Sequence, residues 1–147
     1  MKKVLFAFTA LFFSVALMAQ NAAVKQEKAE DYIKFKDLSH NFGKIKQGVP
    51  VTFDFEFTNV GDKPLVIETA TPSCGCTTPV WPQAPVAKGK TDKVTAGFNA
   101  AGQGAFSKTI KVKLAGVDAP VVLTITGDVL TADEYAKFEK EKSTKKG

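Results

Sequence analysis

The sequence predicts an all-β protein: a sandwich of two sheets with about seven strands, followed by a short C-terminal helix. Two patterns lead to this expectation. Between residues 32 and 130, short segments alternate apolar and polar residues with the period of two that a half-buried strand requires. Turn-forming Gly, Pro, Asn and Asp residues separate these segments, and no helical period interrupts them.

The clearest predicted strand is Val51–Asn59, where from residue 51 to residue 58 the odd positions are apolar and the even positions are polar. Phe55, in the middle of the apolar face, should therefore lie buried between the two sheets. In the segment 106–114, the lysines are assigned to a solvated face. Further strands are expected at 32–36, 65–67, 94–98, 106–114 and 121–129, and turns or irregular crossings at 40–43, 47–48 and 79–85.

The chain divides into four parts. Residues 1–19 predict a secretory signal peptide, because two lysines precede an apolar run at 4–18 that is shorter than the roughly 20 residues of a membrane span. Residues 20–31 are polar and predict a flexible linker, and residues 32–130 form the sandwich domain. Residues 131–147 predict a helix and a charged tail. The protein should be exported, to the periplasm or outside the cell, with no membrane span after signal cleavage.

The C-terminal helix has a recognisable start. Thr131 can cap the first turn, and Glu134 lies three residues later, where its carboxylate can reach back to the Thr131 backbone. Tyr135 and Phe138 lie three residues apart and should share one face of this helix.

Both cysteines of the chain lie in the segment Thr71–Pro79, which reads Thr-Pro-Ser-Cys-Gly-Cys-Thr-Thr-Pro. On an extended backbone, the Cys74 and Cys76 side chains leave on the same side, with Cα atoms about 6.6 Å apart. A disulfide therefore needs the chain to contract at Gly75, which has no side chain to oppose it. In an oxidising compartment, we expect a local and easily reduced disulfide. An inert local bridge and two buried thiols that shape a turn are the alternatives.

The sequence has few residues that could form a metal, catalytic or nucleic-acid-binding site. A zinc site needs four ligands, and besides the two cysteines only His40 offers a comparable donor, so neither a metal nor another cofactor is expected. His40 is assigned to local backbone contacts, and Asp54 and Glu56 to the solvated face of their strand. The chain contains no arginine and carries a formal charge of only +5, which argues against nucleic-acid binding.

Several runs resemble the bacterial "domain of unknown function 1573" family, from about Phe35 to Val129. The most specific of them is Ser73-Cys74-Gly75-Cys76-Thr77. The others are residues 40–45, 57–61, 64–67, 85–90 and 104–106. The resemblance implies an exported immunoglobulin-like sandwich, similar to domains that often serve as binding or scaffolding modules, and it implies no established activity.

Two hypotheses of function follow. The first is a non-catalytic binding or structural module, not an enzyme, whose partner is another exported or envelope protein. The second is a thiol–disulfide role of Cys74 and Cys76, in which Ser73, Gly75 and Thr77 support the motif.

Overall fold

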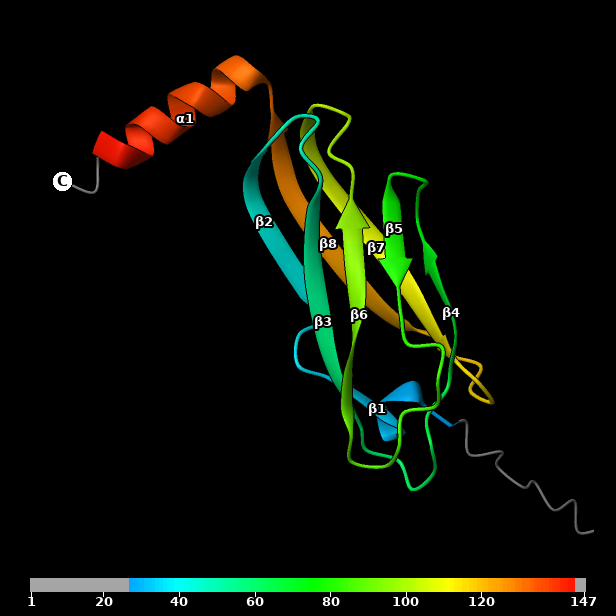
Figure 1. Ribbon diagram of the computed structural model, residues 1–147. Coiled ribbons are helices and arrows are strands. Elements are labelled where there is room, and N and C mark those ends of the chain that lie inside the picture. Colours follow the sequence, from blue (N-terminus) through cyan, green and yellow to red (C-terminus); the bar gives the residue numbers. More distant parts are fainter. Residues whose placement is uncertain (1–26, 145–147) are drawn as a thin grey trace, which may run out of the picture.

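The computed structural model describes residues 27–144 and shows eight strands, a short 3-10 turn and one α-helix (Figure 1). The predicted signal peptide, residues 1–19, lies outside the described residues. The elements in chain order are η1 (Ala29–Asp31), β1 (Ile33–Phe35), β2 (Ser39–Lys46), β3 (Val51–Asn59), β4 (Ile67–Pro72), β5 (Thr77–Val80), β6 (Thr91–Phe98), β7 (Gly104–Leu114), β8 (Val121–Leu130) and α1 (Ala132–Thr144).

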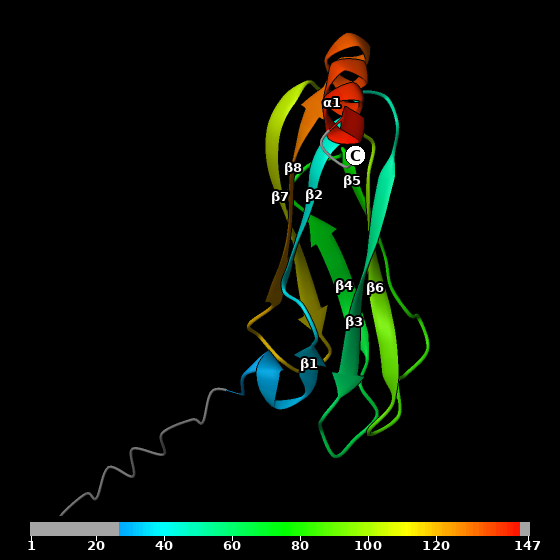
Figure 2. The ribbon, with the colours of Figure 1, turned by 90° about the vertical axis from the view of Figure 1, so that its left-hand side faces the viewer.

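The strands form two four-stranded sheets that pack face to face, as the view in Figure 2 shows. The first sheet has the order β1-β3-β6-β5, and the second has the order β2-β8-β7-β4. The predicted two-sheet sandwich is therefore confirmed, with eight strands rather than about seven. Strands β4 and β5 lie at one edge of the sandwich, and β2 lies at the opposite edge (Figure 1).

Strand β3 forms where the alternation predicted it. Phe55 and Phe57 are 0% and 1% exposed, whereas the intervening Glu56 faces solvent. Strands β6, β7 and β8 complete the core with valines, leucines and isoleucines at alternate positions. This alternation is the pattern from which these strands were predicted. The buried residues they contribute include Val94, Ile110, Val112, Leu114, Leu123, Ile125 and Val129.

The turn predicted at 40–43 is wrong, because these residues belong to β2. This strand pairs in parallel with β8, and its register shifts between Asn41 and Lys44. Gly43, with φ of +66°, allows this bulge and was the source of the turn prediction. Gly127 of β8 lies opposite, where an added Cβ would come within 2.9 Å of the Gly43 carbonyl oxygen. The parallel partner, β8, is distant in the sequence, so a local sequence pattern could not predict this pairing.

The irregular crossing predicted at 79–85 begins later than expected, since Pro79 belongs to β5. Among the strands of residues 27–144, β5 pairs only with β6 and forms the edge of its sheet. An edge strand tolerates proline, because one side of its backbone has no ladder to complete. Pro72 ends β4, the corresponding edge of the second sheet.

The packed domain starts slightly before the predicted boundary. Ala29–Asp31 form the 3-10 turn η1, and Ala29 is 1% exposed. The part of the expected linker at 20–26 lies outside the described residues. The packed domain thus begins ahead of Tyr32, because a small apolar side chain in a polar segment fills a gap at the end of the core.

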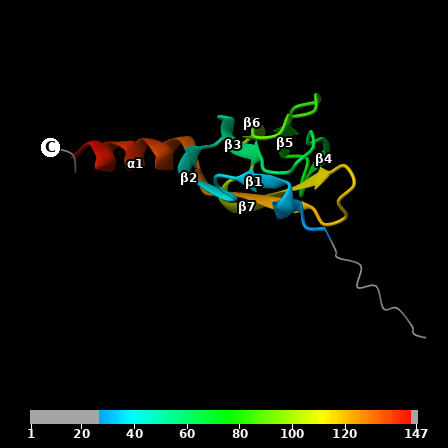
Figure 3. The ribbon, with the colours of Figure 1, turned by 90° about the horizontal axis from the view of Figure 1, so that it is seen from below.

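Helix α1 leaves the end of the sandwich opposite to β1 and projects away from it (Figures 1 and 3). Its start matches the prediction: the Thr131 N–H donates to Glu134 Oε2 at 2.9 Å, and the Glu134 N–H donates to Thr131 Oγ1 at 3.4 Å. The hydrogen bonds that the Thr131 N–H and the Thr131 hydroxyl donate to the Glu134 carboxylate hold the pKa of Glu134 below its ordinary value. The Phe138 ring lies 4.9 Å from Lys44 Nζ and connects the helix to β2.

Candidate thiol site at the crossover between the sheets

The cysteine motif lies on the short crossover that takes the chain from β4 in one sheet to β5 in the other. Ser73–Cys76 is the whole connection. The structure joins Cys74 and Cys76 in a disulfide with Cα atoms 5.3 Å apart. This separation is shorter than the roughly 6.6 Å of two extended residues, so the chain contracts at Gly75. Gly75 is exposed, and no neighbour lies within 4 Å of where its Cβ would be.

Backbone hydrogen bonds fix the crossover to both sheets without help from the sulfur atoms. On the second sheet, the Ser73 N–H donates to the Thr109 carbonyl at 2.8 Å, and the Thr109 N–H donates to Ser73 Oγ at 3.1 Å. At the far end, the Asn99 N–H donates to the Cys76 carbonyl at 3.1 Å. Ser73 therefore has a defined role in the motif: its side chain extends the ladder between β4 and β7 by one step.

The two sulfur atoms have different surroundings. Cys76 packs against the hydrophobic core, whereas Cys74 is not part of that packing. Thr77 is only 3% exposed, and its hydroxyl oxygen lies 3.6 Å from Cys74 Sγ. Since a disulfide sulfur carries no proton, the Thr77 hydroxyl is the donor in this contact. Thr77 thus distinguishes Cys74 from Cys76 chemically.

Lys108 of β7 was expected on the solvated face, and the structure places it on the inner face instead. It pairs with Ile125, which is fully buried, and it lies two residues from the buried Ile110, so all three share the inner face. Its exposure is intermediate, whereas Lys111 points to solvent as predicted. Ser73 is hydrogen-bonded to Thr109, so Lys108 is the first residue of β7 beyond the part that the crossover contacts. The sequence could have predicted the inward position of Lys108, because it lies two residues from Ile110 and a strand places such residues on the same face.

The disulfide should contribute little to stability. For a loop of about three residues, the chain-entropy estimate is only ~1.6 kcal/mol, and the hydrogen bonds of the crossover persist without it. We expect the Cys74→Ser/Cys76→Ser double variant to lose no more than about 1.6 kcal/mol of unfolding free energy in urea denaturation. A loss above about 3 kcal/mol would show that the bridge is a major structural element.

A second feature of interest is the open edge of β2. The Thr124 N–H donates to the Leu38 carbonyl, and the Gln47 N–H donates to the Leu130 carbonyl. These two bonds show which residues at either end of β2 direct their backbone groups toward β8. By alternation on either side of the bulge, the backbone groups of four other residues point away from β8. They are Ser39, Asn41, Lys44 and Lys46, and no strand within residues 27–144 pairs with this side.

The carboxylates of β3 are engaged in ion pairs. Hydrogen bonds from Lys93 and then Thr95 hold the pKa of Asp54 below its ordinary value, and Lys93 Nζ lies 2.7 Å from Asp54 Oδ2. Glu56 pairs with Lys36 at 3.7 Å. Each carboxylate has its own cation, which fits the expected solvated face.

His40 lies on the inner side of β2 rather than in a turn. Its ring stacks on Phe53 with a centroid distance of 3.7 Å and meets Phe42 edge-on. It is part of an aromatic cluster at the β2 edge, whereas the cysteines lie at the opposite edge, so the structure does not bring them together. Within residues 27–144, no three metal-ligating side chains converge.

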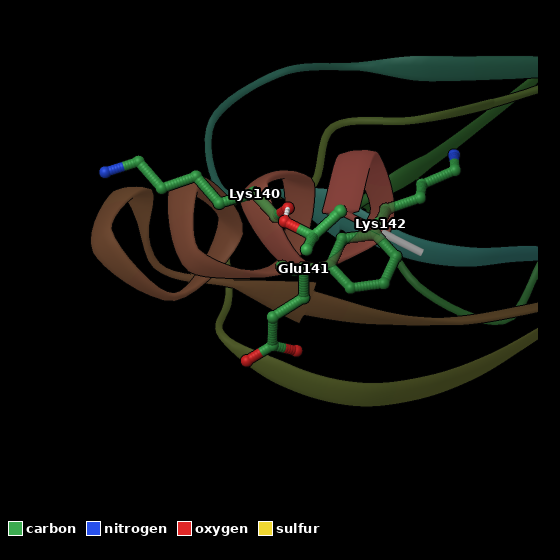
Figure 4. A pocket seen from close by; sticks show the side chains of 5 residues that line it. Lys140, Glu141 and Lys142 are labelled. Carbon is green, nitrogen blue, oxygen red and sulfur yellow. Dashed lines mark hydrogen bonds between the residues drawn. The ribbon is translucent and has the colours of Figure 1, made fainter. Parts of the chain in front are cut away.

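The shallow hollow along α1 lacks the character of a binding site. Lys140, Glu141 and Lys142 line it together with Phe138 and Thr144, and Figure 4 shows that the three labelled side chains point away from one another. A ligand site usually has polar groups that converge on one point. Among the described helices, none is long and apolar enough to cross a membrane.

The fold defines an immunoglobulin-like β-sandwich with a two-cysteine crossover between its sheets. The chain belongs to the family described as "Protein of unknown function (DUF1573)", which matches residues 33–129. The family resemblance of the sequence is therefore confirmed. No curated protein matches the chain.

Similar solved structures support the same fold. A protein of unknown function from Porphyromonas gingivalis W83 aligns with a TM-score of 0.57 and 15% identity, over 66% of this chain and 46% of that one. The ASH/PapD-like domain 7 of human CEP192 aligns with a TM-score of 0.56 and 13% identity, over 72% and 90% of the two chains. The VesB protease of Vibrio cholerae aligns with a TM-score of 0.52 and 19% identity, over 69% and 33%. The chain thus spans less than half of the Porphyromonas protein, and these likenesses concern the fold alone.

Proposed function

We propose that this chain is an exported, non-catalytic module that binds another exported or envelope protein by adding an extended segment of that protein to β2. The observation that carries the proposal is the open edge of β2, an eight-residue strand whose outward backbone groups have no strand partner within residues 27–144. An unpaired edge of this length is a template for strand addition. Export is supported by the two lysines and the short apolar run at the start of the sequence.

The other three sheet edges are less suited to strand addition. Strand β1 has only three residues, and β4 and β5 carry Pro72 and Pro79. Short edges and prolines are the usual means of preventing strand addition. The edge of β2 has no proline, and its protection is limited to the bulge at Gly43 and to two lysines.

The charges beside this edge favour an acidic partner segment. Lys44 and Lys46 are exposed and come from the half of β2 that follows the bulge. Lys44 also contacts the Phe138 ring, which places α1 next to the same half of the strand. An extended segment with Asp or Glu opposite these lysines would gain cross-strand charge pairs in addition to the backbone hydrogen bonds.

The test compares two substitutions of one residue. Asn41→Pro removes an outward N–H, whereas Asn41→Ala keeps it and removes only the side chain, including its 2.7 Å bond from the Gly43 N–H. In cells that naturally export the protein, each variant is cross-linked, and the exported adducts are identified by mass spectrometry. We expect the amount of cross-linked adduct to fall about fivefold for Asn41→Pro, because the partner segment loses one backbone hydrogen bond. For Asn41→Ala the amount should be unchanged.

The same fractions check the location of the protein and the fold of the variants. The chain recovered outside the cytoplasm should begin near Gln20, and both variants should unfold within a few degrees of the wild type. Equal adducts from a folded Asn41→Pro variant and the wild type would contradict strand addition at β2. Retention of residues 1–19 in the membrane fraction would contradict export as a cleaved protein.

A further inference from the structure

The Cys74–Cys76 pair is not required to connect the two sheets. The hydrogen bonds of Ser73 to Thr109 and of Asn99 to Cys76 hold the two ends of the crossover independently. Between these fixed ends, Gly75 is exposed and has open space around it. Breaking the sulfur–sulfur bond therefore leaves the strands paired as before. The bond can open and close as a local event.

The surroundings assign different roles to the two sulfurs. Cys76 packs against the core, which favours an uncharged sulfur. Cys74 lies outside that packing and receives the hydroxyl of the buried Thr77. A hydroxyl donor stabilises a thiolate, because hydrogen bonds to charged acceptors are stronger than those to neutral ones. Cys74 is therefore the sulfur better suited to bear negative charge and to meet a substrate.

Lys108 is a cation next in sequence to Thr109, the residue of β7 that the crossover contacts. It is half-buried on the inner face of β7, one residue beyond the Thr109 that pairs with Ser73. Strand β4 ends at Pro72, so the part of β7 that contains Lys108 is itself a sheet edge next to the crossover. A lysine near a cysteine favours the thiolate form. An inward lysine also discourages strand addition at this edge, and the two effects are compatible.

We propose that Cys74 and Cys76 form a thiol–disulfide exchange site that oxidises exposed dithiols of unfolded or partly folded exported proteins. A substrate thiolate attacks Sγ of Cys74, the bond to Cys76 breaks, and Cys76 leaves as a thiolate that takes a proton from solvent. The second substrate thiolate then attacks the substrate sulfur of the mixed disulfide, and Cys74 leaves as a thiolate stabilised by Thr77. One disulfide is lost from this chain, one is gained by the substrate, and two electrons pass between them.

The substrate class follows from the position of the site. Cys74 and Cys76 are both partly exposed, with the exposed Gly75 between them, so a dithiol on a mobile segment can reach the disulfide. A thiol buried in a folded protein cannot. This exchange is separate from strand addition at β2, which lies at the opposite edge of the sandwich.

The first experiment compares the reactivity of the two cysteines. The mature chain carrying Cys76→Ser retains the Cys74 thiol, and the chain carrying Cys74→Ser retains the Cys76 thiol. Both are incubated with oxidised glutathione at neutral pH, and mixed-disulfide formation is followed by mass spectrometry. We expect the Cys74 thiol to react at least about fivefold faster. Equal rates, or a faster Cys76 thiol, would overturn the assignment of Cys74.

The second experiment tests Thr77 in the Cys76→Ser background. Thr77→Val keeps the volume and removes the hydroxyl, and Thr77→Ser keeps the hydroxyl. We expect Thr77→Val to slow the reaction of Cys74 several-fold and Thr77→Ser to restore it, with unchanged circular dichroism in both. If Thr77→Val unfolds the chain, Lys108→Gln is used instead and should also slow the reaction. An unchanged rate in a folded Thr77→Val or Lys108→Gln variant would exclude the proposed stabilisation.

The third experiment tests the activity of the wild-type chain. In mixtures of reduced and oxidised glutathione, the pair should be partly reduced, and the chain should accelerate the oxidation of reduced ribonuclease beyond the rate in glutathione alone. The Cys74→Ser/Cys76→Ser double variant should give no acceleration. A pair that stays fully oxidised in every mixture, or a wild-type rate equal to that of the double variant, would overturn the exchange site.

Discussion

Phe55→Ala should lower the free energy of unfolding by about 3–5 kcal/mol, the cost of removing a large buried aromatic side chain and leaving a cavity. Phe55 is 0% exposed, and its ring packs edge-on against Phe53 at a centroid distance of 4.9 Å. It lies at the middle of β3, an interior strand of its sheet, so few neighbours can move to fill the space. Urea denaturation measures the loss as a shift of the midpoint at constant slope.

The matched control is Glu56→Ala on the opposite face of the same strand. Glu56 is solvent-exposed, and its contact with Lys36 at 3.7 Å is an open surface pair. We expect a change within about ±0.5 kcal/mol, as is usual for surface positions. Equal midpoint shifts for Phe55→Ala and Glu56→Ala would contradict the inward orientation of Phe55.

Asn59 is the second position at which a single substitution should have a large effect. It is 1% exposed at the end of β3 and makes three hydrogen bonds. Its Nδ2 donates to the carbonyls of Lys63 and Val86, both at 2.8 Å, and its Oδ1 accepts the Gly61 N–H at 3.0 Å. Asn59 thus connects the end of β3 with the turn that follows and with the segment around Val86.

Asn59→Ala should lower the free energy of unfolding by about 3 kcal/mol, because it leaves buried backbone groups without partners. Asn59→Asp should cost more, since a carboxylate would face two carbonyl oxygens in place of the amide donor. The control is Asn41→Ala, where an exposed asparagine makes the same type of bond to Gly43, and where we expect less than about 1 kcal/mol. If Asn59→Ala and Asn41→Ala had equal effects in thermal denaturation, the proposed role of Asn59 would be excluded.

The sequence predicted those strands whose two faces differ in polarity. Val51–Asn59 shows strict alternation, because one face meets the core and the other meets water, and the observed strand has the same limits. Strand β2 lacks this contrast: a bulge at Gly43 breaks its period, and its partner β8 comes from the other end of the chain. Strand β5 was partly hidden because Pro79 normally argues against a strand, and only its edge position makes the proline acceptable.

The two cysteines of the candidate site could be predicted from the sequence, but the groups that surround each sulfur could not. The spacing of Cys74 and Cys76 indicated a local pair on a stiff loop, and the structure shows that this loop connects the two sheets. The difference between the two sulfurs depends on the direction of the Thr77 hydroxyl and on the packing of Cys76 against the core, and neither can be read from a local sequence pattern. Asn59 carried a clearer signal, since an asparagine two residues before a glycine often bonds to the backbone of a turn.

The parallel pairing of β2 with β8 has a consequence for when the domain can fold. Ser39 pairs with Thr124, so β2 can take its place in the second sheet only after β8, about 85 residues later in the sequence, has been synthesised. Strand β7 also needs β8 as its neighbour on one side. Non-local pairing of this kind slows folding, because a long stretch of chain must be closed before the contacts form. The second sheet therefore cannot be completed until β8 has been synthesised, whereas the first sheet does not depend on β8.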